Sequence, residues 1–405
     1  MPMRMSNLKE VIATSGHHPL HTVWGMIEQA ANNHITIRPS GIVEFLDNPF
    51  SWATKQIVGV LSPSSEATVL GTAVHAAAEF GYRCILDNQG LPSVEECAVA
   101  IDESLKNEYV WLENPTMTIE QMTTEAIRLF TVYHTEVMPF ANPVAAEERF
   151  VLEAWDGIQL AGTTDRIERR ADGTLAITDI KTSAKNLSGE KVEGSDELKA
   201  MRQKLKELNK LSERHAPQYN DLKEAGKVVK EIQRKLGLKK TTEEEKAMLQ
   251  VDLEEAETSL VELQGEVDKW LEGVQEERDQ LQTEIDRIAP DIEKRQYEAD
   301  CLAAMHKHGL QLASYAFLYE AATGNTIDWG RIEVIIKYDP TPVVKILEFP
   351  LHIYKRECAM AVDLMVEAIQ ALRAGTPARL LFRMNPETFR GSELTEMVRE
   401  IVMAS

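Results

Sequence analysis

The sequence contains little of what membrane proteins, disulfide-linked proteins and iron–sulfur proteins require. It has no run near the ~18 consecutive apolar residues of a membrane-spanning helix, and its first residues lack the apolar stretch of a signal peptide. Its four cysteines are scattered without C-x-x-C spacing, which argues against a zinc site, an iron–sulfur cluster and a disulfide framework. We therefore expect a protein of the reducing cytoplasm with no membrane partner.

The chain is also short of positive charge. Its 44 Lys and Arg residues face 65 Asp and Glu residues, giving a formal net charge of −21, which disfavours binding to phosphates unless the charge is unevenly spread. The distribution is uneven, because residues 195–240 carry 13 basic and 7 acidic residues whereas residues 241–300 carry 6 and 20. At 405 residues and 43 % hydrophobic content, the chain can form a full catalytic domain with an elaboration.

Residues 195–300 predict two long helices of opposite charge. Apolar residues recur in both at alternating spacings of three and four, the pattern of a coiled coil, and Thr242 is suited to cap the second helix. We predict an antiparallel coiled-coil arm at residues 191–304, inserted between two parts of the catalytic core at residues 1–190 and 305–405. A partner contact, an oligomer contact and a solvated hairpin that only stiffens the domain are alternative roles for it.

The most informative segment reads GTTDRIERRADGTLAITDIK, from Gly162 to Lys181. A turn at residues 171–173, with glycine in the left-handed position, predicts a β-hairpin in which Asp165 lies opposite Asp179. Two carboxylates on directly opposed residues repel unless a proton or a cation lies between them. Lys181 returns to the same strand face, so the hairpin predicts a site for a hard divalent ion with an ammonium group beside it. An ordinary charged surface hairpin is the alternative.

Residues elsewhere in the chain are candidates to complete this site. His75 and Glu79 share one face of a predicted helix, where a histidine among alanines is alternatively a buried core residue. Gln311 and Tyr315 share a face of a later helix, where the tyrosine alternatively only packs. Glu148, on a predicted strand, is either a third carboxylate or half of an ion pair, and we favour the ion pair.

These motifs occur in the order of those of the PD-(D/E)xK nuclease superfamily, which the chain resembles. The resemblance is closest to RecB-type and phage recombination exonucleases, a group that includes lambda exonuclease and the RecE nuclease. It implies an α/β fold of restriction-endonuclease type, with a mixed sheet flanked by helices and the coiled-coil hairpin inserted. The chain departs from the family pattern at Thr164, which replaces a proline, at Asn48, which replaces the cysteine of iron–sulfur relatives, and in the long arm.

The resemblance also implies a role for each residue. Asp165, Asp179 and the backbone carbonyl of Ile180 would hold Mg²⁺ or Mn²⁺, and His75 would be an extra metal ligand. Lys181 would orient or deprotonate the attacking water. Gln311 and Tyr315 would help to place Lys181 and the scissile phosphate, and Glu79 and Glu148 are weaker candidates. No iron–sulfur cluster is expected.

We therefore expect a metal-dependent exonuclease that degrades linear double-stranded DNA for recombination or repair in a phage or bacterial system. Its expected partners are DNA, a single-strand annealing or other recombination protein, and further copies of the chain. The alternatives are an endonuclease of the same superfamily in defence or DNA processing, and a non-catalytic coiled-coil DNA-binding protein. Basic residues near the core are candidate DNA contacts: Arg166, Arg169, Arg170, Lys185, Arg379, Arg383 and Arg390.

Overall fold

The computed structural model describes residues 3–15, 18–61, 64–112, 115–184, 189–238, 240–338 and 341–384. Contacts divide the chain into two compact units. The core unit comprises Met1–Gly189 and Asp300–Ser405, and the arm unit comprises Glu190–Ala299. A search of the described helices finds none that is both long and apolar enough to span a bilayer.

The core unit is built on a mixed sheet of six strands. These are β2 (Ile35–Ile37), β4 (Pro143–Trp155), β5 (Ile158–Arg169), β6 (Leu175–Ser183), β7 (Trp329–Ile336) and β8 (Val343–Pro350). The strand order is β2-β5-β6-β7-β8, and β4 pairs with the other edge of β5. The pairs β4–β5, β5–β6 and β7–β8 are antiparallel, whereas β2–β5 and β6–β7 are parallel. A two-stranded sheet joins β1 (Met3–Arg4) to β3 (Val60–Leu61).

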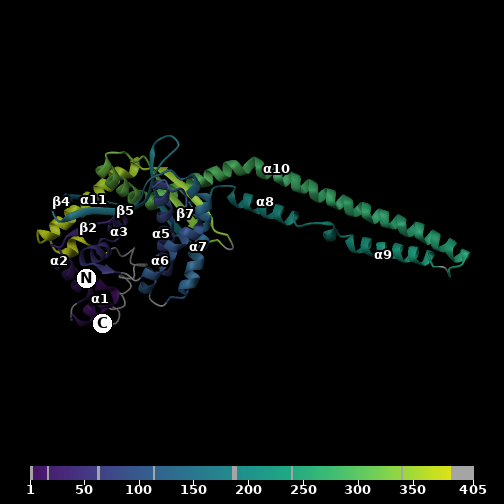
Figure 1. The fold of residues 1–405 in the computed structure, drawn as a ribbon, viewed down its shortest axis with the longest axis horizontal. Helices are drawn as coiled ribbons and strands as arrows, with labels where there is room; N and C mark the ends of the chain where they lie inside the picture. The colour runs from purple at the N-terminus through teal and green to yellow at the C-terminus, as the bar shows by residue number, and fades with distance from the viewer. Residues whose placement is uncertain are drawn as a thin grey trace. The chain divides into compact units, whose positions relative to one another are not determined.

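Helices flank this sheet, as predicted, and give the unit two apolar layers (Figure 1). One layer contains α5 (Glu66–Leu86), α6 (Val94–Glu108) and α7 (Ile119–Glu136), which pack on Ile180 of β6 and Ile335 of β7. The other contains α3 (Pro39–Asp47), α11 (His352–Arg373) and the end of α10 (Glu243–Thr323), with Ile167 and Ile177. Because successive strand residues point to opposite faces, Ile177 and Ile180 enter different layers.

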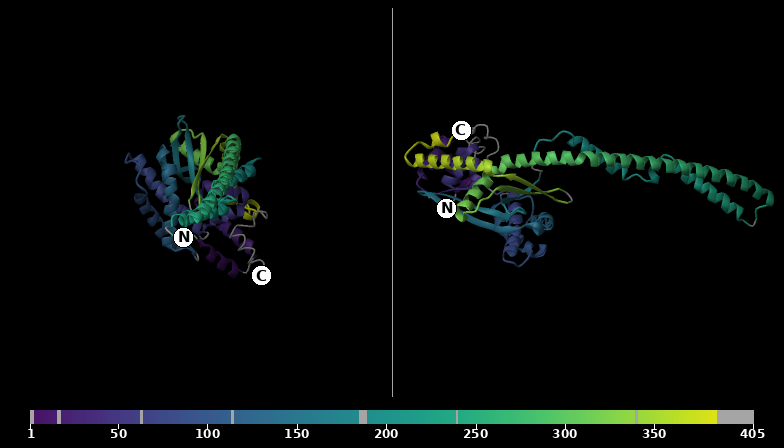
Figure 2. Two further views of the ribbon diagram at one scale, coloured as in Figure 1. Left: turned by 90° about the vertical axis from the view of Figure 1, so that its right-hand side faces the viewer. Right: turned by 90° about the horizontal axis from the view of Figure 1, so that it is seen from above.

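The remaining helices of the core unit lie near its N-terminal segments. They are α1 (Met5–Thr14), α2 (Pro19–Gln29), α4 (Pro49–Ala53) and α12 (Ala378–Leu381). The views in Figure 2 place the yellow α11 beside the purple N-terminal region, in agreement with the contacts of α11 with α3 and of α12 with α2. Segments more than 300 residues apart in sequence therefore close one layer of the core.

The β5–β6 hairpin has the predicted register. Its pairs run from Arg169 opposite Leu175 to Arg166 opposite Thr178, and Gly173 in the turn has a φ of +85°. The ladder stops one residue before Asp165 and Asp179. Since β4 occupies one edge of β5 and β2 pairs with residues 158–160 on the other, residues 161–165 have no strand partner on that second edge within the described chain. The sheet is thus open where the two acids lie.

In the arm unit, α8 (Ser195–Leu208) and α9 (Tyr219–Leu236) run beside the first part of α10 (Figure 1). Leu198 of α8 is buried with Ile285 and Ile292, while Leu222 of α9 is buried with Val267. Two ion pairs cross between α8 and α10: Arg202 with Glu293 at 2.6 Å and Lys204 with Glu277 at 2.5 Å. Pro217 lies in the break between α8 and α9, which is consistent with the lack of an amide hydrogen in proline. Pro290 also lacks this hydrogen but lies inside α10.

A charged cluster is fully buried beside the sheet. The Arg166 guanidinium lies 2.7 Å from Glu333 and 2.8 Å from Glu168, and it stacks over the Tyr82 ring at 4.6 Å. Burial raises the pKa of Glu333, but the charges of Arg166 and Arg331 outweigh burial and hold that pKa below its ordinary value. The expectation that Arg166 contacts DNA is therefore wrong, because its side chain is inaccessible. Lys185 and Arg390 lie outside the described residues.

Replacing Arg166 with methionine should destabilise the protein by about 3 kcal/mol, because Glu333 and Glu168 would stay buried without their main counter-charge. Urea denaturation followed by circular dichroism measures the change. Lys106→Met, which removes an exposed ion pair with Asp102, is the control and should shift the midpoint little. Equal midpoints for Arg166→Met and the wild type would show that the cluster contributes no net stability.

Candidate functional site

Three carboxylates lie across three adjacent strands at the opening of the sheet. The β4–β5 register places Glu147 beside Asp165, between the pairs Ala146–Arg166 and Glu148–Thr164. The β5–β6 register, continued by one residue, places Asp179 on the other side of Asp165. Glu147 has a φ of +46°, a left-handed conformation that costs energy in a non-glycine residue and occurs preferentially at functional sites.

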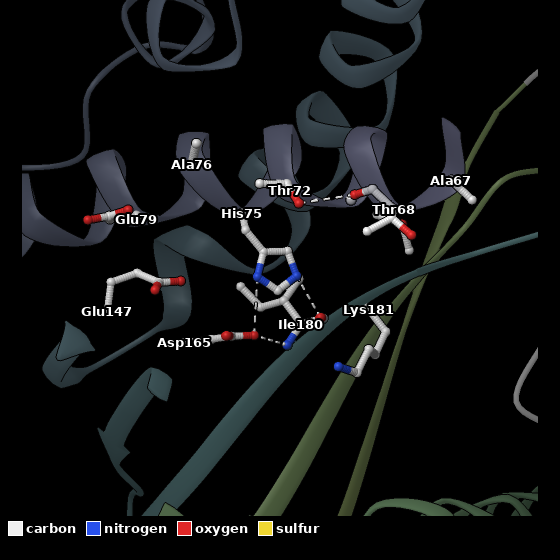
Figure 3. A pocket seen from close by; sticks show the side chains of 12 residues that line it. Ala67, Thr68, Thr72, His75, Ala76, Glu79, Glu147, Asp165, Ile180 and Lys181 are labelled. Carbon is white, nitrogen blue, oxygen red and sulfur yellow. Dashed lines mark hydrogen bonds and ion pairs between the residues drawn. The ribbon is translucent and has the colours of Figure 1, made fainter. Parts of the chain in front are cut away.

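His75 approaches the central carboxylate from α5, whose N-terminus is capped by Ser65. Its Nδ1 lies 3.4 Å from Oδ2 of Asp165, and its Nε2 lies 2.7 Å from the carbonyl oxygen of Ile180. The Ile180 amide donates to the same Asp165 oxygen at 2.7 Å. Figure 3 shows the imidazole between these two groups, so ring, carboxylate and backbone form one connected set.

The charges of this set shift each pKa. Burial lowers the pKa of His75, but the negative charge of Asp165 outweighs burial and raises it to about 9. Burial raises the pKa of Asp165, but His75 and the Ile180 amide lower it below its ordinary value. Burial and the charge of Asp165 raise the pKa of Glu147 to about 7. The same two causes raise the pKa of Asp179 to about 6, against the opposing charge of Lys181. The raised pKa values of His75, Glu147 and Asp179 show that the site favours the binding of protons or of another cation.

Lys181 and the end of α10 form the other side of the site. The Lys181 Nζ atom lies 2.9 Å from Oδ1 and 2.8 Å from Oδ2 of Asp179. Burial opposes the charged lysine, but Asp179 raises its pKa. Burial raises the pKa of Tyr315, as do the charges of Asp179 and Asp165, while Gln311 lowers it. The charges of Asp179 and Asp165 thus both act on Tyr315.

Two weaker candidates have other surroundings. Glu79 lies at the same pocket, where its carboxylate pairs with Arg83 at 2.6 Å. Glu148 is exposed, and the carboxylate that lines the pocket is that of Glu147. The sequence reasoning missed Glu147 because it did not determine the pairing of β4 with β5. Strand alternation alone could not have identified it, because the positive φ of Glu147 interrupts the regular alternation of β4.

The donor set fits a hard divalent ion. Single ligand atoms of His75, Glu147 and Asp165 all lie within 4.8 Å of one another, and the pocket they line has a volume of about 620 Å³. Carboxylate and carbonyl oxygens with one imidazole suit Mg²⁺ and Mn²⁺ better than thiolate-seeking metals. Figure 3 shows Glu147 and Asp165 directed towards the space below α5, where a cation would relieve their mutual repulsion.

Comparison with known proteins supports the same chemistry. A family model described as the PD-(D/E)XK nuclease superfamily matches residues 36–301, about two thirds of the chain. No curated protein matches the chain.

Replacing Glu147 with glutamine should weaken Mn²⁺ binding about tenfold or more, because one charged ligand of the set is lost. Isothermal titration calorimetry on the purified protein measures the affinity. Glu148→Gln alters the neighbouring exposed carboxylate and is a matched control that should bind as tightly as the wild type. Equal affinities for the two variants would remove Glu147 from the ligand set.

The same variant has a second readout in pH. The Glu147 pKa is raised from 4.5 to about 7 on folding, so the folded state binds the proton more tightly than the unfolded state. The contribution of this group to stability is therefore favourable at low pH and is lost as pH rises from 4.5 to 7. In metal-free solution, Glu147→Gln should lose less stability over that interval than Glu148→Gln.

Proposed function

This chain belongs to the PD-(D/E)XK nuclease superfamily, and we propose that it is a Mg²⁺- or Mn²⁺-dependent exonuclease that degrades linear double-stranded DNA. The observation that carries the proposal is the row of Glu147, Asp165 and Asp179 across three strands, with Lys181 held against the last of them. A row of carboxylates, of which Asp179 is buried and the other two are half-buried, is costly for folding unless a cation offsets the charge. The lysine places a mobile positive charge where a nucleophile can form.

The residues of the site divide into ion ligands and substrate-directing groups. Glu147, Asp165, Asp179, His75 and the Ile180 carbonyl would hold the divalent ion. When bound, such an ion supplies Lewis acidity that activates water and offsets charge on a phosphate. The Ile180 amide fixes Asp165 through its hydrogen bond, so that carboxylate is oriented before any ion arrives.

Lys181 acts on the water that attacks the phosphodiester. Its ammonium group orients the water and stabilises negative charge that develops in the transition state. Gln311 and Tyr315 place this lysine and the phosphate from the α10 side. Tyr315 is held close to β5 because Gly162 leaves room for its ring, and a Cβ at that position would lie 2.6 Å from Cε1.

Exonuclease action rests on the likeness of the His75, Asp165, Asp179–Lys181 and Gln311–Tyr315 motifs to those of recombination exonucleases. We propose that the product is single-stranded DNA for an annealing protein in recombination or repair. Arg169 and Arg383 are exposed and are candidate contacts for the DNA backbone, since phosphate binding needs positive charge on an otherwise acidic chain.

Asp165→Asn and Lys181→Ala should each reduce the Mg²⁺-dependent degradation of linear duplex by about a hundredfold or more, because each removes charge stabilisation at the reacting phosphate. Release of nucleotides from an end-labelled duplex measures the rate, and the 5′ and 3′ labels together report polarity. Asp172→Asn removes an exposed carboxylate from the turn of the same hairpin and is the control. Full activity in both site variants would refute the site.

Closed circular duplex separates the rival activities. An exonuclease leaves it intact, whereas an endonuclease of the superfamily cuts it. Activity that survives EDTA would contradict the ion-dependent mechanism. Absence of hydrolysis with every divalent ion would favour a non-catalytic DNA-binding protein.

We propose that the arm unit is an antiparallel coiled coil that is dispensable for phosphodiester hydrolysis. The Gly189 amide donates to Oδ1 of Asp300 at 2.9 Å, so the two ends of the core unit meet where the arm unit is inserted.

Joining Gly189 to Asp300 through a short Gly-Ser linker should therefore leave the rate on a short linear duplex within about twofold of wild type. Rate and molar mass by light scattering test this. Fewer chains per particle than in the wild type, after allowance for the deleted residues, would assign the arm to an oligomer contact. A lost rate in a folded variant would contradict dispensability.

A further inference from the structure

One buried nitrogen beside the site has no partner. His308 shares a face of α10 with Gln311 and Tyr315, since the three lie at spacings of three and four residues. Its side chain is 8 % exposed, and its Nε2 makes no hydrogen bond to any residue that the structure describes. Buried polar atoms without a partner are rare in folded proteins, because each costs the desolvation of that atom. The His308 ring therefore implies a partner that is absent from this arrangement.

Lys181 is the cationic group whose charge acts most strongly on this histidine. Burial lowers the pKa of His308 to about 4, and the positive charge of Lys181 contributes to the same shift. The imidazole is thus neutral at physiological pH, and a neutral imidazole has one nitrogen that accepts a hydrogen bond. The Gln311 side chain acts on the His308 pKa in the opposite direction and raises it.

The present partner of Lys181 conflicts with ion binding. Its Nζ contacts both oxygens of Asp179, at 2.9 and 2.8 Å. A divalent ion bound to Asp179 competes with the lysine for the same oxygens, and its charge repels the ammonium group. The Lys181 side chain is 34 % exposed, so once released it stays partly desolvated and needs another acceptor.

We propose that His308 is a positioning residue whose Nε2 accepts a hydrogen bond from Lys181 when Asp179 binds a divalent ion. The exchange moves the lysine from the carboxylate to the imidazole and leaves both Asp179 oxygens available to the ion. It keeps the ammonium group at the site, beside the water that it orients. The inference rests on the proposed ion-dependent function and adds a residue that the motifs of the sequence did not include.

Two substitutions of His308 isolate the role of the acceptor. His308→Leu keeps much of the volume and removes the acceptor, whereas His308→Gln keeps one. We expect His308→Leu to weaken Ca²⁺ binding about tenfold, because Lys181 then remains on Asp179, and to lower kcat in Mg²⁺ by a similar factor with little change in the KM for DNA. His308→Gln should recover most of both. His306→Leu, an exposed residue on the same helix, is the matched control.

Thermal stability separates this role from a structural one. In metal-free buffer, His308→Leu should melt at the same temperature as the wild type or higher, because the variant removes an unpaired buried polar atom. A lower melting temperature, together with unchanged affinity for Ca²⁺, would assign His308 to the core and overturn the proposal.

A double-substitution cycle gives the decisive result. Lys181→Met removes the competing ammonium group and should tighten Ca²⁺ binding, and adding His308→Leu to it should change the affinity no further. Independent effects of the two substitutions would overturn the proposal. The cycle measures Ca²⁺ affinity and needs no catalysis. Coupling between the two substitutions in a protein without nuclease activity would count against the proposed function alone. Nuclease activity without such coupling would count against the role of His308 alone.

Discussion

Negative charge concentrated at Asp165 is the constraint on which the site depends. The carboxylates of Glu147 and Asp179 flank it on neighbouring strands, and two cationic side chains approach it, His75 from α5 and Lys181 from β6. His75 neutralises the centre of the row and Lys181 neutralises one end, so the folded protein tolerates three acids where the sheet opens. The same compensation makes both groups rivals of a divalent ion. Binding an ion therefore requires His75 to lose a proton and Lys181 to move away from Asp179, in addition to space for the ion.

Much of the site could be predicted from the sequence, because turn chemistry, strand alternation and helical spacing determine where its residues lie. A glycine in the turn and a period of two fixed the register of the β5–β6 hairpin, and that register placed Asp165, Asp179 and Lys181. Helical spacing paired Gln311 with Tyr315. The mixed sheet flanked by helices also agrees with the prediction, since the segments around the hairpin have the corresponding periodicities.

The remainder depends on contacts between distant parts of the chain. Glu147 is turned towards Asp165 by a local backbone conformation that no propensity favours. Arg166 is buried because Glu333, 167 residues later, provides its counter-charge, and an arginine beside an acid gives no hint of that in the sequence. His308 had no motif to mark it. The reason to consider it is that its buried Nε2 atom has no hydrogen-bond partner among the described residues, and only the three-dimensional structure shows this.

The junction of the two units has a consequence for folding. Strands β6 and β7 pair in parallel although more than 140 residues separate them, and pairings of such high contact order fold slowly. The Val192 amide donates to Gln296 within the arm unit, so assembly of that unit, when it precedes that of the sheet, brings its two ends together. The effective loop between β6 and β7 then shrinks, and most of its closure entropy is lost before the sheet assembles. An insertion that lengthens the chain between β6 and β7 can in this way accelerate the pairing of the two strands.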